Sequence, residues 1–491
     1  MAWLLLIPVL LPIVAGLGLL ILNFKERMQR QIYVASVIIV NAALSIIFMF
    51  TVPAQKFTFV YFTEKINLTL RVDGMSTVFG MIVSILWIVA TFYSFEYMKH
   101  EGKENKFFSF FTISFGVVLG IAYSGNLITM YFFYELLTMA TLPLVMHAMD
   151  KKASSAGKKY VAYSISGASF GFIAIMLLMK YGTSLDFVFG GILDPTLVSG
   201  MENLLLVGFI LAFFGFGIKA AIFPFFDWLP SAGVAPTPVS ALLHAVAVVN
   251  AGIFAIIRVT FYNFGTDFLR GTWAQYIVMG ATIVTIVLGS SLALRAKHFK
   301  RRLAYSTVSN LSYMLFGITM MTPEGLVGGV THMLFHSVLK ITLFFVAGAV
   351  IYKTGREHVD ELYGMGRAMP ITFATFTISS LGLIGIPPLM GFTSKFYLGT
   401  AAIDSGNPLA YIGAGALIVS ALLTALYMFD IILKAYFPPK DIDVKTLNKD
   451  VRDPNKLMTI PLIGLTVTSI VIGVYPAPII HIFEQIATGL F

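Results

Sequence analysis

Several ionisable side chains lie inside stretches of sequence that are otherwise apolar. Lys219 is flanked by GFGI and AAIFPFF, and Glu135 lies within the run TMYFFYELLTMATLPLV. Lys340 follows two histidines in THMLFHSVLKITLFF. A charge in the hydrocarbon core of a membrane is costly, and such residues commonly mark ion pathways. These side chains are therefore candidates for moving an ion through a membrane.

Glu135 and Lys219 have opposite charges, and we expect them to pair. Pairing lets both groups stay charged away from water, and its loss would change whether the lysine holds its proton. Such a pair could hold and release a proton, as a pump requires. The alternative is a static ion pair that only fixes helix packing.

His332, His336 and Lys340 recur at every fourth position, which places them on one face of a helix at about 6 Å per step. Histidine titrates near neutral pH, so this stripe is typical of a proton wire. A metal site of the form His-x-x-x-His is one alternative, although no neighbouring carboxylate completes it. Packing histidines satisfied by serine or backbone are another.

Two further cationic groups extend the set to other helices. His244 lies within an apolar stretch, and Lys395 follows the glycine- and proline-rich run LGLIGIPPLMGFTS. We predict a lateral polar axis at mid-depth, formed by the proton-translocation candidates Glu135, Lys219, His244, His332, His336, Lys340 and Lys395.

Helix breaks are predicted beside two of these lysines. Pro224 interrupts the apolar helix that carries Lys219, and Pro387 and Pro388 interrupt the one that carries Lys395. Irregular backbone at membrane depth is tolerated only where protein or a water-filled cavity surrounds it. Each break therefore indicates a site inside the protein.

The composition defines the class of protein that must position these groups. Of 491 residues, 58% are hydrophobic and 12% are charged, against about 25% charged in soluble domains. The apolar runs are continuous over about 20 residues, which indicates membrane-spanning helices and excludes an alternating β-barrel pattern. The N-terminal run lacks a basic flank and a clear cleavage site, so we expect a retained first span.

Other function classes are disfavoured by what the sequence lacks. The chain has no cysteine, which excludes disulfides, thiolate metal sites and Fe–S clusters. No nucleotide-binding or zinc motif is present, so we expect no cofactor in this chain, and any redox centre should belong to a partner. The net charge of +9 lies in short loops, a pattern of membrane topology and not of nucleic-acid binding.

The fold expected is all-α and polytopic, with about fourteen transmembrane helices. They are predicted at 2–23, 31–52, 72–98, 107–123, 126–149, 160–181, 202–223, 239–262, 272–294, 303–321, 326–352, 370–402, 409–436 and 457–482. The broken spans seven and twelve lie five apart, so spans 4–8 and 9–13 are predicted to be two inverted five-helix repeats. The corresponding segments are 1–106 (helices 1–3), 107–262 (first repeat), 263–436 (second repeat) and 437–491 (a loop and helix 14).

Most lysines and arginines fall in the loops that follow odd-numbered spans, such as 295–302 after span nine and 440–456 after span thirteen. Cation-rich loops face the cytoplasm, so we expect a multi-pass protein of the cytoplasmic (inner) membrane with both termini on the outer side.

With these residues in view, nearly the whole chain resembles the antiporter-like subunits of respiratory complex I, Mrp-type cation/proton antiporters and membrane-bound energy-converting hydrogenases. The matching pieces are YSFEYM (93–98), NLITMYFFYE (126–135), the stretch 219–244, KRRLAYSTVSNLSYM (300–314), the stretch 332–340 and GFTSK (391–395). The resemblance implies a fourteen-helix fold with inverted repeats and a charged axis. It assigns Glu135 and Lys219 to a pair, His244 to a relay, the stripe 332–340 to the centre and Lys395 to the end.

The sequence also departs from the family pattern. Phe226, Ser231 and Gly233 replace residues that are often histidine, aspartate and histidine, and Asn250 stands where many relatives carry lysine. A missing cation at Asn250 leaves His244 or a water chain to connect Lys219 with the central histidines. The sequence ends after span fourteen, so the long lateral helix of the distal complex I subunit is not expected.

The function predicted is proton translocation within a larger complex, driven by redox chemistry in partner subunits. Those partners would be other antiporter-like subunits and a peripheral redox arm carrying Fe–S, Ni–Fe, flavin or quinone. The chain itself would be the ion-translocating part of an oxidoreductase or translocase, with no redox chemistry of its own. Membership of a Na⁺/H⁺ antiporter without redox partners is the first alternative, and a static membrane scaffold is the second. Protons are the expected ion, with Na⁺ as a second candidate.

Overall fold

Helices dominate the computed structural model, which describes residues 2–22, 24–52 and 55–489. Residue 23, where the first span was expected to end, lies outside this part. The long elements are α1 (Leu6–Leu22), α2 (Arg27–Thr51), α3 (Gly74–Glu101), α4 (Glu104–Ala122), α5 (Leu127–Val145), α6 (Lys151–Tyr181), α8 (Glu202–Gly217), α10 (Thr237–Ala245), α11 (Val248–Ile257), α13 (Trp273–Arg295), α14 (Phe299–Thr319), α15 (Pro323–Thr354), α17 (Pro370–Ile384), α18 (Met390–Asp404), α19 (Pro408–Tyr436), α21 (Lys456–Val474) and α22 (Ala477–Ala487).

Short elements connect these helices. They are the 3₁₀ turns η1 (Ala2–Leu5), η2 (Ala232–Val234) and η4 (Val359–Glu361), the π-helix η3 (Arg258–Phe264), and the helices α7 (Pro195–Val198), α9 (Trp228–Ser231), α12 (Thr266–Leu269), α16 (Met365–Ala368) and α20 (Val444–Leu447). The one departure from an all-α fold in the described residues is a small antiparallel hairpin, β1 (Phe57–Tyr61) with β2 (Asn67–Leu70), which was not predicted.

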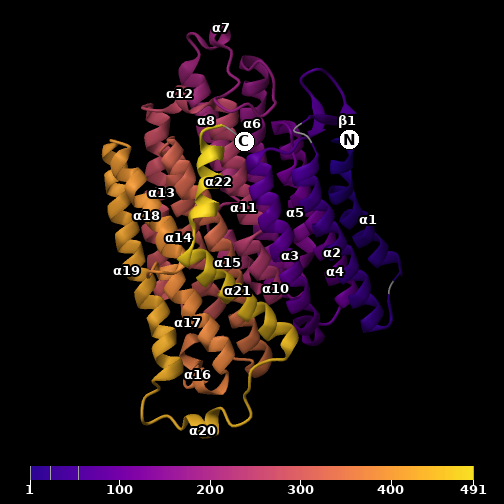
Figure 1. Cartoon of the computed structure of the whole chain (residues 1–491), viewed down its shortest axis with the longest axis vertical. Helices are drawn as coiled ribbons and strands as arrows, with labels where there is room; N and C mark the ends of the chain where they lie inside the picture. The colour runs from indigo at the N-terminus through magenta and orange to yellow at the C-terminus, as the bar shows by residue number, and fades with distance from the viewer. Residues whose placement is uncertain (1, 23, 53–54, 490–491) are drawn as a thin grey trace.

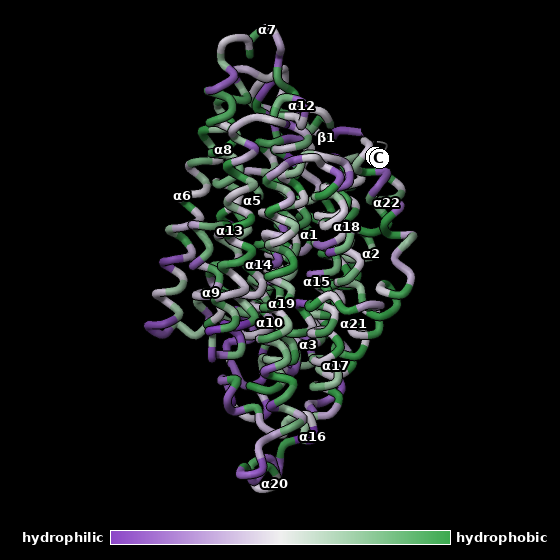
Figure 2. The backbone as a smooth tube through the Cα atoms, turned by 90° about the vertical axis from the view of Figure 1, so that its left-hand side faces the viewer, coloured by the Kyte–Doolittle hydropathy of each residue, from purple (hydrophilic) through white to green (hydrophobic). Residues whose placement is uncertain are grey.

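Eleven helices of the described chain are long and apolar enough to cross a membrane, which confirms the predicted class. Predicted spans seven and twelve are not among them because they are broken into shorter helices, α8 and α17. Span ten is absent from the eleven because α14 is too polar, although all of it except Arg301 is buried by protein. The count of fourteen spans therefore remains a prediction. Figure 2 shows the apolar middle of the molecule, with hydrophilic segments gathered toward its two ends.

The core of the molecule is built around α15. This helix of 32 residues packs against α3, α10, α14, α17, α18, α21 and α22. Because neighbouring helices surround it, α15 can carry titratable side chains without presenting them to lipid. Both expected repeats thus contribute helices to one shared centre (Figure 1).

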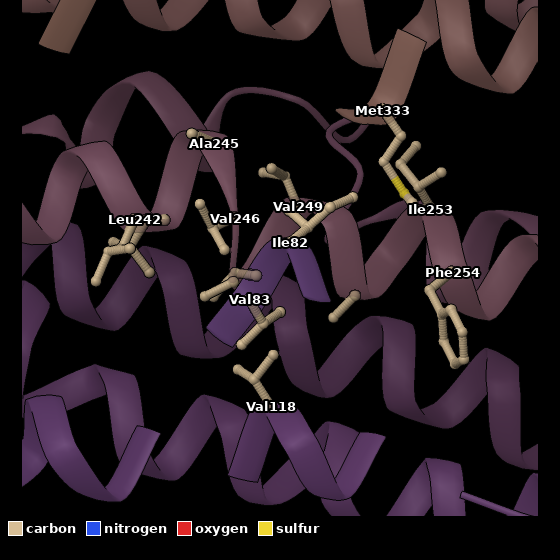
Figure 3. Close-up of a cluster of buried hydrophobic side chains, with 14 of the residues drawn as sticks. Ile82, Val83, Val118, Leu242, Ala245, Val246, Val249, Ile253, Phe254 and Met333 are labelled. Atoms are coloured by element: carbon tan, nitrogen blue, oxygen red, sulfur yellow. The ribbon is translucent and has the colours of Figure 1, made fainter. Parts of the chain in front are cut away.

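Span eight contains an interruption that was not predicted. The helix expected over 239–262 ends at Ala245 and restarts at Val248. Val246 and Ala247 both donate their backbone N–H groups to the Leu242 carbonyl, at 2.9 and 2.8 Å. The β-branched residues here are poor helix formers, and Figure 3 shows Val246 and Val249 among apolar side chains of α3, α4 and α15. Side-chain packing thus stabilises the interrupted backbone.

The two ends of the chain lie toward the same end of the molecule. The start of α1 and the end of α22 lie near the end that carries α7 and α12, opposite α20 (Figure 1). Span fourteen is itself divided, since α21 stops at Val474 and α22 begins at Ala477.

Candidate ion-translocation site

The first helix break surrounds Lys219. Helix α8 ends at Gly217, so Lys219 lies in the turn after the helix, whereas the sequence predicted a helix continuing to Pro224. Ala221 adopts a left-handed conformation, with φ of 53°, and strained backbone of this kind clusters at functional sites. The carbonyls freed by the break are satisfied, because Trp228 donates to Ile218 and Tyr134 donates to Phe216, both at 2.7 Å.

Close packing of α11 holds this turn in place. A Cβ atom on Gly252 would lie 2.6 Å from the backbone nitrogen of Ala220 and 3.0 Å from the carbonyl carbon of Lys219. Only glycine permits such an approach, so span eight presses directly against the Lys219 turn.

The predicted Glu135–Lys219 ion pair is not formed. The Lys219 ammonium, 1% exposed, donates to the Tyr134 carbonyl and lies 3.6 Å from the centroid of the Tyr134 ring. Glu135 keeps one buried carboxylate oxygen without a hydrogen-bond partner in the described chain. Adjacent residues on a helix point in different directions, so a lysine seated against Tyr134 does not reach the Glu135 carboxylate. The two charges still interact electrostatically.

The stripe on α15 is present, but its members have different environments. The ring nitrogens of His332 contact the Ser394 hydroxyl at 2.9 Å and the Asn310 amide oxygen at 3.1 Å. His332 therefore fits the packing alternative as well as a wire. His336 lies 6.3 Å from it between ring centroids, is fully buried, and has no partner on either ring nitrogen within the described residues.

Lys340 continues the stripe one turn further along α15. Its ammonium, fully buried, donates to the Leu303 carbonyl at 3.1 Å and to the Ser306 hydroxyl, both on α14. Within the described chain Lys340 forms no ion pair with a carboxylate, so carbonyl and hydroxyl oxygens alone solvate its ammonium.

His244 lies at the end of α10, next to the unexpected interruption. Its ring stacks on Phe344 of α15 at 4.7 Å between centroids. Like His336, it is fully buried and finds no hydrogen-bond partner for either ring nitrogen in the described part of the chain.

The second helix break positions Lys395. Helix α17 ends at Ile384, and Gly385 reverses the chain with φ of 96°. The Lys395 ammonium donates to the Leu383 and Ile384 carbonyls at 2.7 and 2.8 Å. It therefore caps the C-terminal, negative end of α17, where a cation is favoured. Both breaks contain the predicted prolines, Pro224 in one and Pro387 and Pro388 in the other.

Tyr313 connects Lys395 to the histidines. Its ring centroid lies 5.3 Å from the Lys395 ammonium nitrogen and 5.2 Å from the His332 ring centroid. The second half of the predicted axis is thus a contiguous row of side chains, whereas Glu135 and Lys219 form a separate group.

Asn250 bridges the two halves. Its amide nitrogen donates to the Ala245 carbonyl at 2.9 Å and to the Ser337 hydroxyl at 2.8 Å. The position that lacks the family's lysine therefore holds a neutral hydrogen-bond donor, bonded to the residue that follows His336.

Lys300 is a candidate that sequence reasoning missed. It was counted as a loop cation, yet it is 9% exposed and donates to the Ala235 carbonyl at 3.0 Å. Its charge lies within electrostatic range of His244 and of the acidic residues Glu101 and Glu357. The sequence signal that could have identified Lys300 is its spacing, because Lys300, Leu303 and Asn310 lie on one face of a helix. In the structure this face of α14 contacts α15.

The described residues offer no cluster of three or more histidine, aspartate or glutamate side chains placed to hold a metal ion. Two broken helices around a row of buried lysines and histidines define a polytopic membrane protein with ionisable side chains in its interior. The profile of the family described as NADH:quinone oxidoreductase/Mrp antiporter, transmembrane, matches residues 124–424, and that of the complex I chain 5 N-terminus matches residues 61–108. The chain belongs to this family, as its motifs indicated.

Curated relatives come from both branches of the family. NAD(P)H-quinone oxidoreductase chain 5 of Picosynechococcus sp. is 30% identical, over 98% of this chain and 77% of the relative. A protein of the Na(+)/H(+) antiporter from Alkalihalophilus pseudofirmus is 31% identical, over 77% of this chain but only 50% of the relative.

Solved structures share the fold over the whole chain. The archaeal membrane-bound sulfane sulfur reductase complex contains a chain that aligns with a TM-score of 0.85 and 21% identity, covering 99% of this chain and 97% of that one. The Mrp complex from Dietzia sp. DQ12-45-1b gives a TM-score of 0.86 and 19% identity, over 100% and 98%.

Proposed function

We propose that this chain moves protons through the membrane as the antiporter-like subunit of a redox-driven complex. The path proposed runs from Glu135 and Lys219, past His244, to the stripe His332, His336 and Lys340 and on to Lys395. The observation that carries the proposal is the row of Lys395, Tyr313, His332 and His336, with successive separations of 5.3, 5.2 and 6.3 Å.

The two unpartnered histidines support movement of a proton over a static role. A neutral imidazole donates from one nitrogen and accepts at the other, and buried polar atoms without protein partners are normally satisfied by ordered water. Within the described residues, His244 and His336 are the two fully buried histidines of this kind. They are suited to pass a proton between Lys219 and Lys340, where Asn250 supplies no charge.

The energy source is proposed to lie outside this chain. The sequence has no cysteine to ligate an Fe–S cluster, and its quinone-oxidoreductase relative is named for a redox complex. Redox centres in partner subunits would therefore drive the cycle. The cation-rich end with α20 is proposed to face the cytoplasm.

A second candidate is membership of a multi-subunit Na⁺/H⁺ antiporter without redox partners. The 31% identity to a protein of a Na(+)/H(+) antiporter favours it. Both candidates use the same buried row and differ only in what drives it.

The test is proton movement by the native complex in inverted membrane vesicles, followed with a fluorescent ΔpH probe. Lys219→Ala and Glu135→Ala should each abolish ΔpH formation while the complex still assembles. The control is Lys151→Ala, which removes an exposed lysine at the start of α6. Retained ΔpH in both variants would reject the proposal and favour a scaffold.

The same vesicles separate the two energy sources. ΔpH that forms only when an electron donor is added supports the redox-driven complex. ΔpH that forms on a Na⁺ gradient without a donor supports the antiporter.

A further inference from the structure

A deep apolar groove lies on one flank of the molecule, away from the buried row. Its volume is about 790 Å³, within the range of about 300–1,000 Å³ typical of ligand sites. Helices α3, α21 and α22 form its walls, α2 contributes one residue, and α15 contributes two. None of the side chains proposed for proton movement lines it.

The groove runs along α3 and α21, two helices that are long and apolar enough to cross a membrane. On α3 its lining extends from Thr77 to Phe92, a rise of about 22 Å. On α21, which runs the opposite way, it extends from Lys456 to Ile472. The hydrocarbon core of a bilayer is about 30 Å thick, so the groove occupies most of that depth.

The groove opens on the outer surface of the helix bundle. Ile85 on α3 and Ile460 on α21 line it and are 47% and 62% exposed. Gly464 on α21 also lines it, and a Cβ atom there would meet no heavy atom within 4 Å. The floor is closed by Leu334 and Val338 of α15.

One end of this apolar lining carries a single cation. Lys456 lines the groove at the start of α21 and is exposed, and it joins no ion pair within the described chain. On α3, Lys99 pairs with Glu96. Asp453, three residues before Lys456, accepts from the Ile371 and Thr372 backbone nitrogens.

We propose that the groove binds one phospholipid with an anionic headgroup, its acyl chains along α3 and α21 and its phosphate against Lys456. An apolar channel at membrane depth matches acyl chains, and a lone lysine at its end matches a phosphate by charge. Basic residues beside a membrane-spanning helix attract anionic lipids in the same way, by about 1 kcal/mol each.

A transmembrane helix from a partner is the alternative occupant. The apolar lining would suit it, but the exposed Lys456 at the end of the groove favours an occupant that carries a phosphate.

Native mass spectrometry of the intact complex tests the site. The complex is exchanged into a mixture of phosphatidylglycerol and phosphatidylcholine with identical acyl chains, and the lipids retained after delipidation are counted. Gly464→Trp fills the groove, and Gly415→Trp is its matched control, because Gly415 on α19 is also exposed with no atom within 4 Å of its Cβ position. Lys456→Ala removes the cation, with the exposed Lys449→Ala as its control.

We expect the unmodified complex, Gly415→Trp and Lys449→Ala to retain one more phosphatidylglycerol than Gly464→Trp. Lys456→Ala should keep the lipid but lower the preference for phosphatidylglycerol about fivefold, the ratio that about 1 kcal/mol gives. Equal lipid retention by Gly464→Trp and Gly415→Trp would overturn the proposal.

A photo-reactive residue at Ile85 gives an independent readout in a complex that keeps Gly464 and Lys456. Cross-linking to phospholipid supports the site, and cross-linking to another protein of the complex assigns the groove to a partner helix and rejects it.

Discussion

The amide nitrogen of Asn250 donates a hydrogen bond of 2.8 Å to the hydroxyl of Ser337. Both side chains are fully buried, and they belong to α11 and α15, which come from the two predicted repeats. Ser337 passes its own hydrogen to the Met333 carbonyl at 2.6 Å, so Asn250 must be the donor. The junction between the halves therefore requires a hydrogen-bond donor at position 250.

This requirement predicts an order of stability at position 250. Asn250→Asp places oxygen against the Ala245 carbonyl and buries an uncompensated charge, so it should cost about 3 kcal/mol or more. Asn250→Leu loses two hydrogen bonds but also removes the amide oxygen that has no partner, and should cost about 1 kcal/mol. The midpoints of thermal unfolding of the two variant complexes in detergent measure both losses of stability. Equal midpoints for the two variants would contradict the predicted order.

A pH-dependent contribution to stability is predicted at Asp73, the N-cap residue of α3. Burial alone raises the pKa of this carboxyl, but the charge and hydrogen bonds of Arg258 (2.6 and 2.7 Å) and the Ser76 backbone N–H lower it, and the net pKa is well below its usual value. The contribution is therefore complete above the unfolded pKa of about 3.9, and is lost as the pH falls through the lower folded pKa.

Asp73→Asn tests this directly. Arg258 is fully buried, so removing its partner should destabilise the protein by about 3–5 kcal/mol at neutral pH. The difference from the unmodified protein should stay constant between pH 8 and about pH 5 and shrink in stronger acid. Asp73→Glu, which keeps the charge, serves as the control. A difference that grows on acidification would contradict the prediction.

Glycine is predicted to be essential at one point of the second break. A Cβ atom on Gly391 would lie 1.9 Å from the backbone oxygen of Gly382, so Gly391→Ala should force the two helix ends apart at about 1–3 kcal/mol. Gly399 on the same helix has no atom within 4 Å of its Cβ position. Gly399→Ala should therefore be neutral or stabilising by up to about 1 kcal/mol. Unfolding midpoints of the two variants, compared side by side, check the prediction.

Lys300 is predicted to connect the loop side of the molecule with His244. Lys300→Gln should lower the rate of proton movement about 100-fold, the lower end of what one positioned proton-transfer group contributes. The neighbouring Arg301 is exposed, so Arg301→Gln is the matched control and should leave the rate unchanged. Initial rates of ΔpH formation in inverted vesicles measure both. Equal rates in the two variants would remove Lys300 from the path.

The sequence was informative at positions where the residue type is energetically costly to bury in an apolar environment. Lysines and histidines in apolar runs predicted which side chains lie in the interior, and Lys219, His244, His336 and Lys340 are all buried. The proline-containing breaks in two apolar runs were also predicted, although the first break begins at Gly217, before Pro224, and Pro143 lies inside the continuous helix α5.

The sequence was less informative where the outcome depends on packing between distant segments. Complementary charge predicted a Glu135–Lys219 contact, but the tyrosine beside Glu135 accepts the lysine instead. The interruption at Val246 carries no glycine or proline, and its surroundings come from other helices. Lys300 resembled the cations around it, but the structure buries it and places its ammonium against the Ala235 carbonyl.

The interruption in span eight has a mechanical consequence. Helix α10 packs mainly on α15 and α3, whereas α11 packs on α8 and α14 and is tied to α15 by the Asn250–Ser337 hydrogen bond. The two pieces of one span are thus held by different sets of neighbours. A displacement between those neighbours would change the backbone torsions at Val246 and Ala247, the two residues that join the pieces. His244 lies on one side of this junction and Asn250 on the other.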